Sequence, residues 1–226
     1  DDPSDARFEV STNYAGVSGN DANVGMLTDE ESKWLTKVGY GSPRWQVSLA
    51  MAKNMCEDET PGTAGDAEDC KNWNSYYTTA AGNSGTLTGN QTSYALRGYW
   101  KPESTGIIPA VQLGYDWSTV DDDNVRGSVE ATQAWMAGLM WKDALIDGNT
   151  AGIAFGHPEH ATDYVDVNFP TNDPANKAFA WEAYYDYKVN DGITITPSIF
   201  GFKDRTNGQA GANDGFGGLL QTTFKF

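Results

Sequence analysis

Apolar and polar residues alternate along most of this chain, a period of two that is typical of β-strands whose two faces meet different surroundings. Val47 and Leu49, for example, alternate with Gln46 and Ser48. Ten such segments are predicted, at residues 6–15, 33–40, 44–53, 91–101, 107–117, 131–141, 150–156, 177–189, 192–202 and 216–226. Charged residues fall almost entirely on the polar parity. The pattern predicts an all-β fold with one apolar face and one polar face.

The last segment is the clearest of the ten. Phe216, Leu220, Phe224 and Phe226 lie on one parity, and the chain stops on an aromatic residue. Chain ends of soluble domains usually fray into solvent. A strand of this kind suits a barrel in which the last strand pairs with an earlier one and turns its apolar face to lipid.

The connections between the predicted strands alternate in length. The short connections are 41–43, 102–106, 142–149 and 190–192. The long connections are 16–32, 54–90, 118–130, 157–176 and 203–215. Outer-membrane barrels have short turns at one end and long loops at the other. We therefore expect a transmembrane antiparallel up-and-down β-barrel domain over residues 1–226, with about ten strands in this chain.

Composition is compatible with this expectation. Mean hydropathy is −0.54, and no run of about 20 apolar residues suggests a transmembrane helix. A barrel strand needs an apolar residue only at every second position. Aromatic residues, 12% of the chain, gather near the predicted strand ends, as in the two aromatic girdles of outer-membrane barrels. The alternative is a secreted sugar-binding β-sandwich with an aromatic core.

The net charge of −16 argues against nucleic acid as a partner, because such binding needs a basic surface. Many acidic residues fall in the predicted long connections. The acidic residues expected at a loop mouth are Glu57, Asp58, Glu59, Asp121, Asp122 and Asp123, with further acids at Asp66, Glu68, Asp69, Glu159, Asp163, Asp166 and Asp173. Acidic loops at a pore mouth concentrate cations, and simple solvation is the alternative reading.

The polar parity also predicts the residues that would line a water-filled lumen. They are Arg7, Glu9, Lys37, Arg44, Arg97, Lys101, Asp116, Glu182, Asp186 and Lys188. We expect Arg44 and Arg97 to oppose Asp116 and Glu182 across the lumen, producing a transverse field. The long 54–90 connection is the candidate for a loop that folds into the pore.

Cys56 and Cys70 both lie in the 54–90 connection. In an oxidising compartment they would form a disulfide that closes about a 15-residue ring and stabilises the fold by about 3 kcal/mol in the chain-entropy model. Their spacing fits no zinc motif.

Little in the sequence suggests catalysis or a bound metal. The two histidines, His157 and His160, flank Pro158 and Glu159, a spacing that differs from the helical His-Glu-x-x-His site. A transition-metal contact is a weak alternative to a solvated loop. No Gly-x-Ser-x-Gly motif is present, and neither Ser93 nor Ser198 is marked as an activated nucleophile. We expect no enzymatic activity, no metal and no cofactor.

Three stretches resemble the carboxyl-terminal part of the cyanobacterial outer-membrane porins, the iron-uptake group related to carbohydrate-selective porins. They are Gly148–Pro158, Trp181–Phe200 and Leu219–Phe226, and the resemblance is strongest over residues 130–226. The middle stretch is the most specific, with a long aromatic strand, a Val-Asn-Asp turn and then Ile-Thr-Pro.

The resemblance implies a homotrimeric barrel of about sixteen strands in the outer membrane. It also implies passive passage of small hydrophilic solutes and ions, including iron species or sugars, and a wall-binding amino-terminal segment, which we do not expect within residues 1–226. Residues 1–5 show no signal peptide, so we expect a mature, trimmed or partial chain. We expect residues 1–226 to form the carboxyl-terminal portion of a larger barrel. A closed ten-stranded barrel and a barrel that anchors without an open pore are the alternatives.

Overall fold

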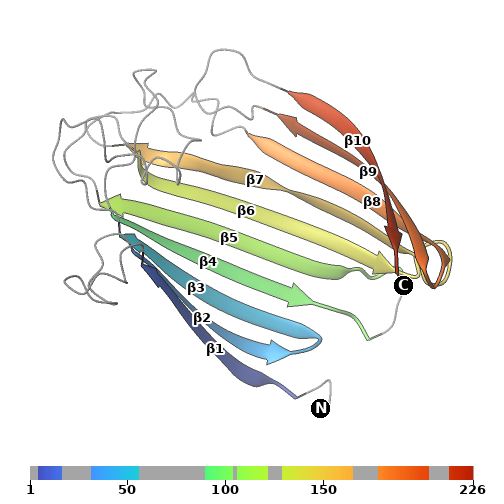
Figure 1. Ribbon diagram of the computed structural model, residues 1–226, viewed down its shortest axis with the longest axis horizontal. Coiled ribbons are helices and arrows are strands. Elements are labelled where there is room, and N and C mark those ends of the chain that lie inside the picture. The colour runs from blue at the N-terminus through green and yellow to red at the C-terminus, as the bar shows by residue number, and fades with distance from the viewer. Residues whose placement is uncertain are drawn as a thin grey trace.

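The computed structural model describes residues 5–16, 32–55, 90–103, 106–121, 129–164, 178–203 and 214–225. In these ranges the chain forms one sheet whose strands follow chain order, β1 to β10 (Figure 1). The strands are β1 Arg7–Gly16, β2 Ser32–Ser42, β3 Trp45–Met55, β4 Asn90–Trp100, β5 Ala110–Asp121, β6 Val129–Lys142, β7 Thr150–Tyr164, β8 Phe179–Asn190, β9 Ile193–Lys203 and β10 Gly215–Phe224. The all-β, antiparallel architecture predicted from the alternation is confirmed.

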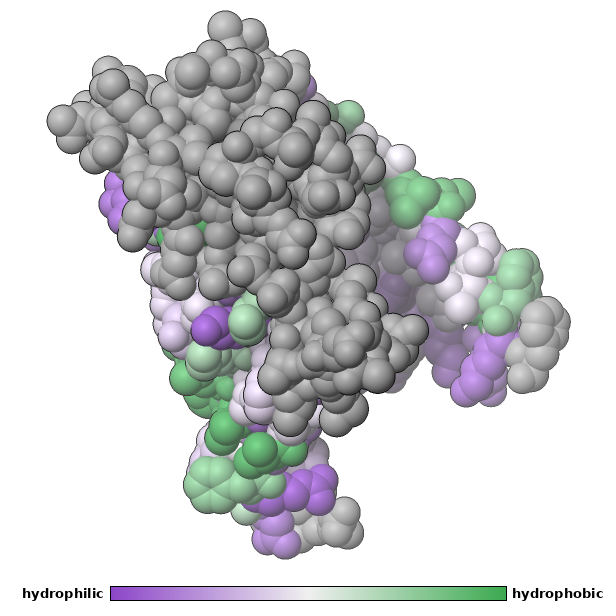
Figure 2. All heavy atoms as spheres, turned by 60° about the vertical axis from the view of Figure 1, so that its left-hand side comes forward, coloured by the Kyte–Doolittle hydropathy of each residue, from purple (hydrophilic) through white to green (hydrophobic). Residues whose placement is uncertain are grey.

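Every strand pairs with its neighbours in sequence, and all pairs are antiparallel. Among the described residues, β1 pairs only with β2 and β10 pairs only with β9. The sheet is strongly curved but open, and its two sides diverge when seen from another direction (Figures 1 and 2). No described segment is a helix of the length and apolar character needed to cross a membrane.

Several predicted boundaries were wrong, and three of these differences change where predicted residues lie. Residues 157–164 belong to β7, because the strand continues past Pro158 through a bulge opposite β6, so Glu159 and Asp163 are not loop residues. Asp121 is the last residue of β5 and not part of the acidic connection. The turn between β2 and β3 is formed by Pro43 and Arg44, and not by residues 41–43, since Ser42 pairs with Trp45.

The pairing register keeps one parity on one face from β2 to β6. Val38 pairs with Leu49, Leu49 with Leu96, Leu96 with Tyr115 and Tyr115 with Trp135. These five side chains are between 40% and 46% exposed, although all are large and apolar or aromatic. We call this surface the convex face.

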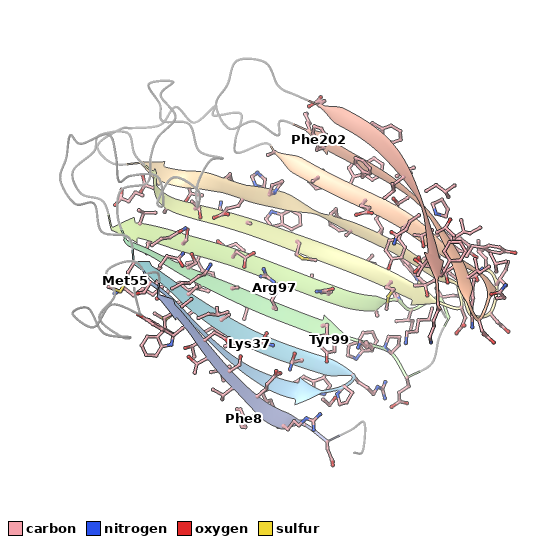
Figure 3. The ribbon with its side chains drawn as sticks, viewed as in Figure 1. Phe8, Lys37, Met55, Arg97, Tyr99 and Phe202 are labelled. Carbon is pink, nitrogen blue, oxygen red and sulfur yellow. The ribbon has the colours of Figure 1, made fainter. Side chains whose placement is uncertain are left out.

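The opposite parity forms the concave face. It carries Gln46, Ser48, Arg97 and Asp116, and the hollows of the sheet are lined largely by residues of this parity. Side chains crowd on this side because the sheet curves around it. Figure 3 shows Arg97 near the middle of the curve and Phe202 towards the β10 side.

The described strands enclose almost no hydrophobic core. Among the described residues, only Val120 and Ala178 are buried hydrophobic side chains. Phe8, Phe216 and Leu220 are instead 75%, 72% and 68% exposed, and green apolar patches are visible on the surface in Figure 2. A soluble domain of this size buries its large apolar side chains in a packed interior. This sheet leaves them outside.

The short connection between β6 and β7 is built around Asn149, which is 1% exposed. Its Nδ2 donates to the Tyr185 hydroxyl at 2.8 Å, and its Oδ1 accepts from the Lys188 backbone N–H at 3.0 Å. The Tyr185 hydroxyl donates to the Ala144 carbonyl at 2.9 Å. Leu145 has a φ of 64°, a conformation unusual for a bulky residue, and the Ile146 N–H donates to the Ala144 carbonyl across it at 2.8 Å. This connection is therefore a structured turn fastened to β8.

Candidate solute-facing surface

On the β1–β3 side of the concave face, Glu9 is the centre of a small charged network. The Gln46 side-chain amide donates to the Glu9 carboxylate at 3.0 Å, and Lys37 Nζ lies 3.8 Å from the same carboxylate. Glu9, Lys37 and Gln46 come from three successive strands. The register brings together two residues that the sequence predicted as lumen-lining, Glu9 and Lys37.

Arg97 and Asp116 form the closest ion pair on the middle strands. Arg97 Nη2 donates to Asp116 Oδ2 at 2.7 Å, and both side chains are more than a third exposed. Gly114, opposite Arg97 on β5, makes room for this geometry, because a Cβ there would lie 3.1 Å from the Arg97 Cδ and Nη1 atoms. Arg97 can therefore lie across the neighbouring strand and reach Asp116.

This arrangement corrects the predicted transverse field. Arg97 and Asp116 are neighbours on adjacent strands, so they do not oppose each other across an opening. Arg44 lies in the turn between β2 and β3 and forms an ion pair with Glu103, so it is not a strand residue of the predicted wall. The local register, invisible in a single strand's parity, determines these partners.

A ladder of polar side chains crosses five strands of the concave face near their long-connection ends. Asn54 Nδ2 donates to Gln91 at 3.4 Å, and Gln91 Nε2 donates to the Ser118 hydroxyl at 3.1 Å. Ser118 and Thr132 share a hydroxyl hydrogen bond, and Thr132 donates to Glu159 at 2.9 Å. Sequence analysis did not single out the first four residues of this polar ladder. They could have been found from the sequence, because each successive strand has a hydrogen-bonding residue at a similar distance from its long connection.

Beyond β7 the concave face is less uniformly polar. The Thr196 hydroxyl donates to Asp186 at 2.6 Å. Glu182 is exposed and pairs in register with Phe200, so a carboxylate and an aromatic ring lie side by side. Aromatic residues on this face were not predicted, because Phe200 and Phe202 carry the parity that was assigned to polar residues.

Three other predicted lumen residues lie at the edges of the strands. Lys101 is not a strand residue, because β4 ends at Trp100. Its Nζ lies 4.7 Å from the centre of the Tyr99 ring. Lys188 pairs with Asp191 in the β8–β9 turn at 2.8 Å. This hydrogen bond and the positive charge of Lys188 lower the pKa of Asp191, so the pair persists at neutral pH and is lost only as pH falls through the lowered pKa. Arg7 begins the edge strand β1.

Several predicted residues lie outside the described residues. They are Glu57, Asp58, Glu59, Asp122, Asp123, Cys56 and Cys70, together with Asp66, Glu68, Asp69, Asp166 and Asp173. The acidic pore mouth, the disulfide and the inward-folding 54–90 connection therefore stay predictions.

The two histidines lie at the bulge of β7. Their ring centres are 3.7 Å apart, and the Nδ1 atom of each lies 3.0 Å from the Pro158 carbonyl oxygen. His160 is buried and its Nε2 lies 3.3 Å from the Gln133 side chain. Within the described ranges, no three His, Cys, Asp or Glu side chains are grouped so that they could hold a metal ion. The placement of the histidines in a solvated loop was wrong.

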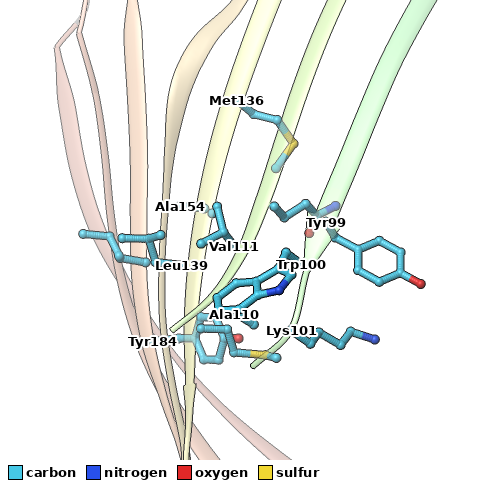
Figure 4. A pocket seen from close by; sticks show the side chains of 13 residues that line it. Tyr99, Trp100, Lys101, Ala110, Val111, Met136, Leu139, Ala154 and Tyr184 are labelled. Carbon is cyan, nitrogen blue, oxygen red and sulfur yellow. The ribbon is translucent and has the colours of Figure 1, made fainter. Parts of the chain in front are cut away.

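A hollow of about 370 Å³ lies towards the short-turn end of the sheet (Figure 4). Tyr99, Gln112, Met140 and Tyr184 are among its lining residues. Gly152 lies opposite Tyr184, and a Cβ there would come within 2.3 Å of the Tyr184 ring. The ring therefore packs flat against the neighbouring strand, and the hollow has a largely apolar floor.

Comparison with known proteins finds sequence similarity between this chain and a curated protein. It is 28% identical over 155 residues to a protein of Synechocystis sp. (strain ATCC 27184 / PCC 6803 / Kazusa) described as uncharacterized protein sll0772. The match covers 59% of this chain, and the chain spans about a quarter of the relative, 26% of its length. No protein-family model and no solved structure matches the chain.

Proposed function

We propose that this chain forms part of an outer-membrane β-barrel porin, through which small hydrophilic solutes and ions diffuse along the concave face. The observation that carries the proposal is the distribution of apolar residues. Most of the large ones are exposed on the convex face of a curved sheet that has almost no hydrophobic core among its described residues. Lipid is the surrounding in which such a face is favourable, and water is the surrounding that suits the charges opposite.

The strands also have the dimensions that a bilayer requires. They are 10–15 residues long, and a tilted strand crosses the hydrocarbon core with about 9–11 residues. Trp45 and Trp100 pair in register at the ends of β3 and β4, and Trp141 at the end of β6 donates to the Ile107 carbonyl at 2.9 Å. Tryptophan rings at this level suit the interface between lipid and water.

The open edges are the reason to propose a larger barrel. The outer backbone groups of β1 and β10 have no partner strand among the described residues, and each unsatisfied group costs several kcal/mol in hydrocarbon. We infer that these edges pair with further strands. A barrel of about sixteen strands that assembles as a trimer is what the resemblance to the cyanobacterial porins implies, and we include it in the proposal. The greater length of the Synechocystis relative is compatible with such an arrangement. Inorganic ions, iron species and sugars are the proposed solutes.

The rival β-sandwich has less support. Its aromatic residues would be enclosed between two sheets packed about 10 Å apart. The described ranges contain a single sheet, and Trp34, Trp100 and Trp135 are 51%, 44% and 40% exposed.

The test of the proposed function is the conductance of the full-length protein, extracted from its native membrane with detergent and inserted into planar lipid bilayers. Steady ohmic steps are the expected result. A folded sample is recognised by its faster migration on electrophoresis before heating. If folded and inserted protein gives no steps, the proposal is wrong, and a barrel that anchors without an open pore becomes the better reading.

Ion selectivity is expected to depend on the Arg97–Asp116 pair. In Arg97→Met the carboxylate loses its counter-charge, so the cation-to-anion permeability ratio should rise by about twofold to fivefold, equivalent to about 0.5–1 kcal/mol. Asp116→Asn should lower the ratio by a similar factor. The reversal potential under a salt gradient measures both changes. Arg97→Lys keeps the charge and is the matched control; shifts of the same sign in the first two variants would contradict the assignment.

A further inference from the structure

A second hollow of the concave face, with a volume of about 790 Å³, extends from β4 to β9. Its floor consists of small residues from three neighbouring strands, Ala134 of β6, Ala154 and Gly156 of β7, and Ala180 of β8. Arg97 and Asp116 border it on one side. Phe200, Phe202 and Glu182 border it on the other side. This volume lies within the range of small-molecule sites, which are typically concave with a few convergent polar groups.

The two phenylalanines present ring faces because glycines lie opposite them. Phe200 pairs with Gly217 and Phe202 with Gly215. A Cβ at these glycines would come within 2.7 Å and 2.2 Å of the respective rings, so both rings lie against the strand surface of β10. Packing an aromatic ring over a cross-strand glycine fixes its orientation. The ring of Phe200 is 39% exposed and therefore accessible from the hollow.

The charges around the hollow favour a cation. Asp116, Glu159 and Glu182 supply three carboxylates, and Arg97 and Lys203 supply two positive charges. Arg97 is already engaged by Asp116, and Glu159 accepts a hydrogen bond from Thr132. Glu182 lies directly beside Phe200 in the register, and in the described part of the chain no hydrogen bond or ion pair joins it to another side chain.

We propose that this hollow is a binding site for organic cations, in which Glu182 neutralises an ammonium group and the faces of Phe200 and Phe202 contact its apolar substituents. An ammonium group over an aromatic face is attracted by the ring quadrupole, and an adjacent carboxylate adds to that attraction. The site rests on the proposed function, since the concave face must be open to water. It adds a preferred solute class, amines and quaternary ammonium compounds.

The site is tested by direct binding, so that the result does not depend on conduction. Benzyltrimethylammonium is titrated into the full-length protein in detergent micelles and binding is followed by calorimetry, with protein-free micelles as the background. We expect saturable binding, with the Kd raised about fivefold to tenfold in Glu182→Gln and about threefold in Phe200→Leu. Benzenesulfonate, which has the opposite charge, should bind at least about tenfold more weakly.

Asp191→Asn is the matched control, because it removes one carboxylate of the same chain outside the hollow and should leave the Kd unchanged. Heat-dependent electrophoretic migration verifies that each variant is folded, and Glu182→Gln changes only an exposed side chain. An unchanged Kd in folded Glu182→Gln, or equal affinity for benzenesulfonate, would overturn the site. A protein that binds the cation but does not conduct would contradict the proposed function and leave the site standing.

Discussion

Replacing Leu96 with arginine is expected to lower the free energy of unfolding in a lipid bilayer by about 2–4 kcal/mol. Leu96 lies on the convex face between Leu49 and Tyr115 and is 44% exposed. In water an arginine at a half-exposed strand position is well tolerated. Near the bilayer midplane it loses its hydration or forces water into the hydrocarbon, so the cost is large only if the convex face contacts lipid.

The matched control is Ala95→Arg, one residue earlier in β4 and on the opposite face. Ala95 pairs with Ala50 and Asp116, so the new guanidinium would lie in the proposed lumen next to a carboxylate. We expect a change within about 1 kcal/mol. Urea unfolding of the full-length protein in phosphatidylcholine vesicles, followed by tryptophan fluorescence, measures both variants. Equal destabilisation by the two arginines would refute the assignment of the convex face to lipid.

The second large effect is expected at Asn149. Replacing it with alanine removes the amide group that donates to the Tyr185 hydroxyl and accepts from the Lys188 backbone N–H. Because Asn149 is 1% exposed, little water can take the place of its amide, and the loss should be about 2–3 kcal/mol in the free energy of unfolding.

Asn190→Ala provides the comparison for this turn. Asn190 is exposed, and its Oδ1 accepts one hydrogen bond, from the Gly192 N–H at 2.9 Å. Solvent can replace this bond, so we expect a loss below about 1 kcal/mol. The same urea titration measures both variants. A similar small loss at Asn149 would mean that the β6–β7 connection contributes little to stability.

Much of the fold was predictable because strand alternation is a local property of the sequence. The segments 44–53 and 192–202 fall within one or two residues of β3 and β9 at each end. The end of β7 was not predictable in the same way. Pro158 and the polar run after it indicated a loop, but a bulge opposite Gln133 and Trp135 accommodates the extra residues and the strand continues.

The candidate site was predictable as a face but not as a set of partners. Parity placed Arg97 and Asp116 on one side of the sheet, whereas their 2.7 Å contact depends on a register between β4 and β5 that neither strand encodes alone. Phe200 and Phe202 were overlooked because apolar residues were all assigned to the lipid side. Gly215 and Gly217, two strand glycines opposite them, were the available signal.

The strands follow one another in the sheet in the order of the sequence, and this order determines how the width of the sheet can change in evolution. In the described part of the chain each of the ten strands pairs only with its neighbours in sequence, so one hairpin can be added or removed without altering the register of the others. The diameter of a closed barrel grows roughly linearly with its strand number. If such a sheet closes into a barrel, duplication or loss of a gene segment that encodes one hairpin would therefore widen or narrow it in steps of two strands, and the side chains of the remaining strands would be inherited unchanged.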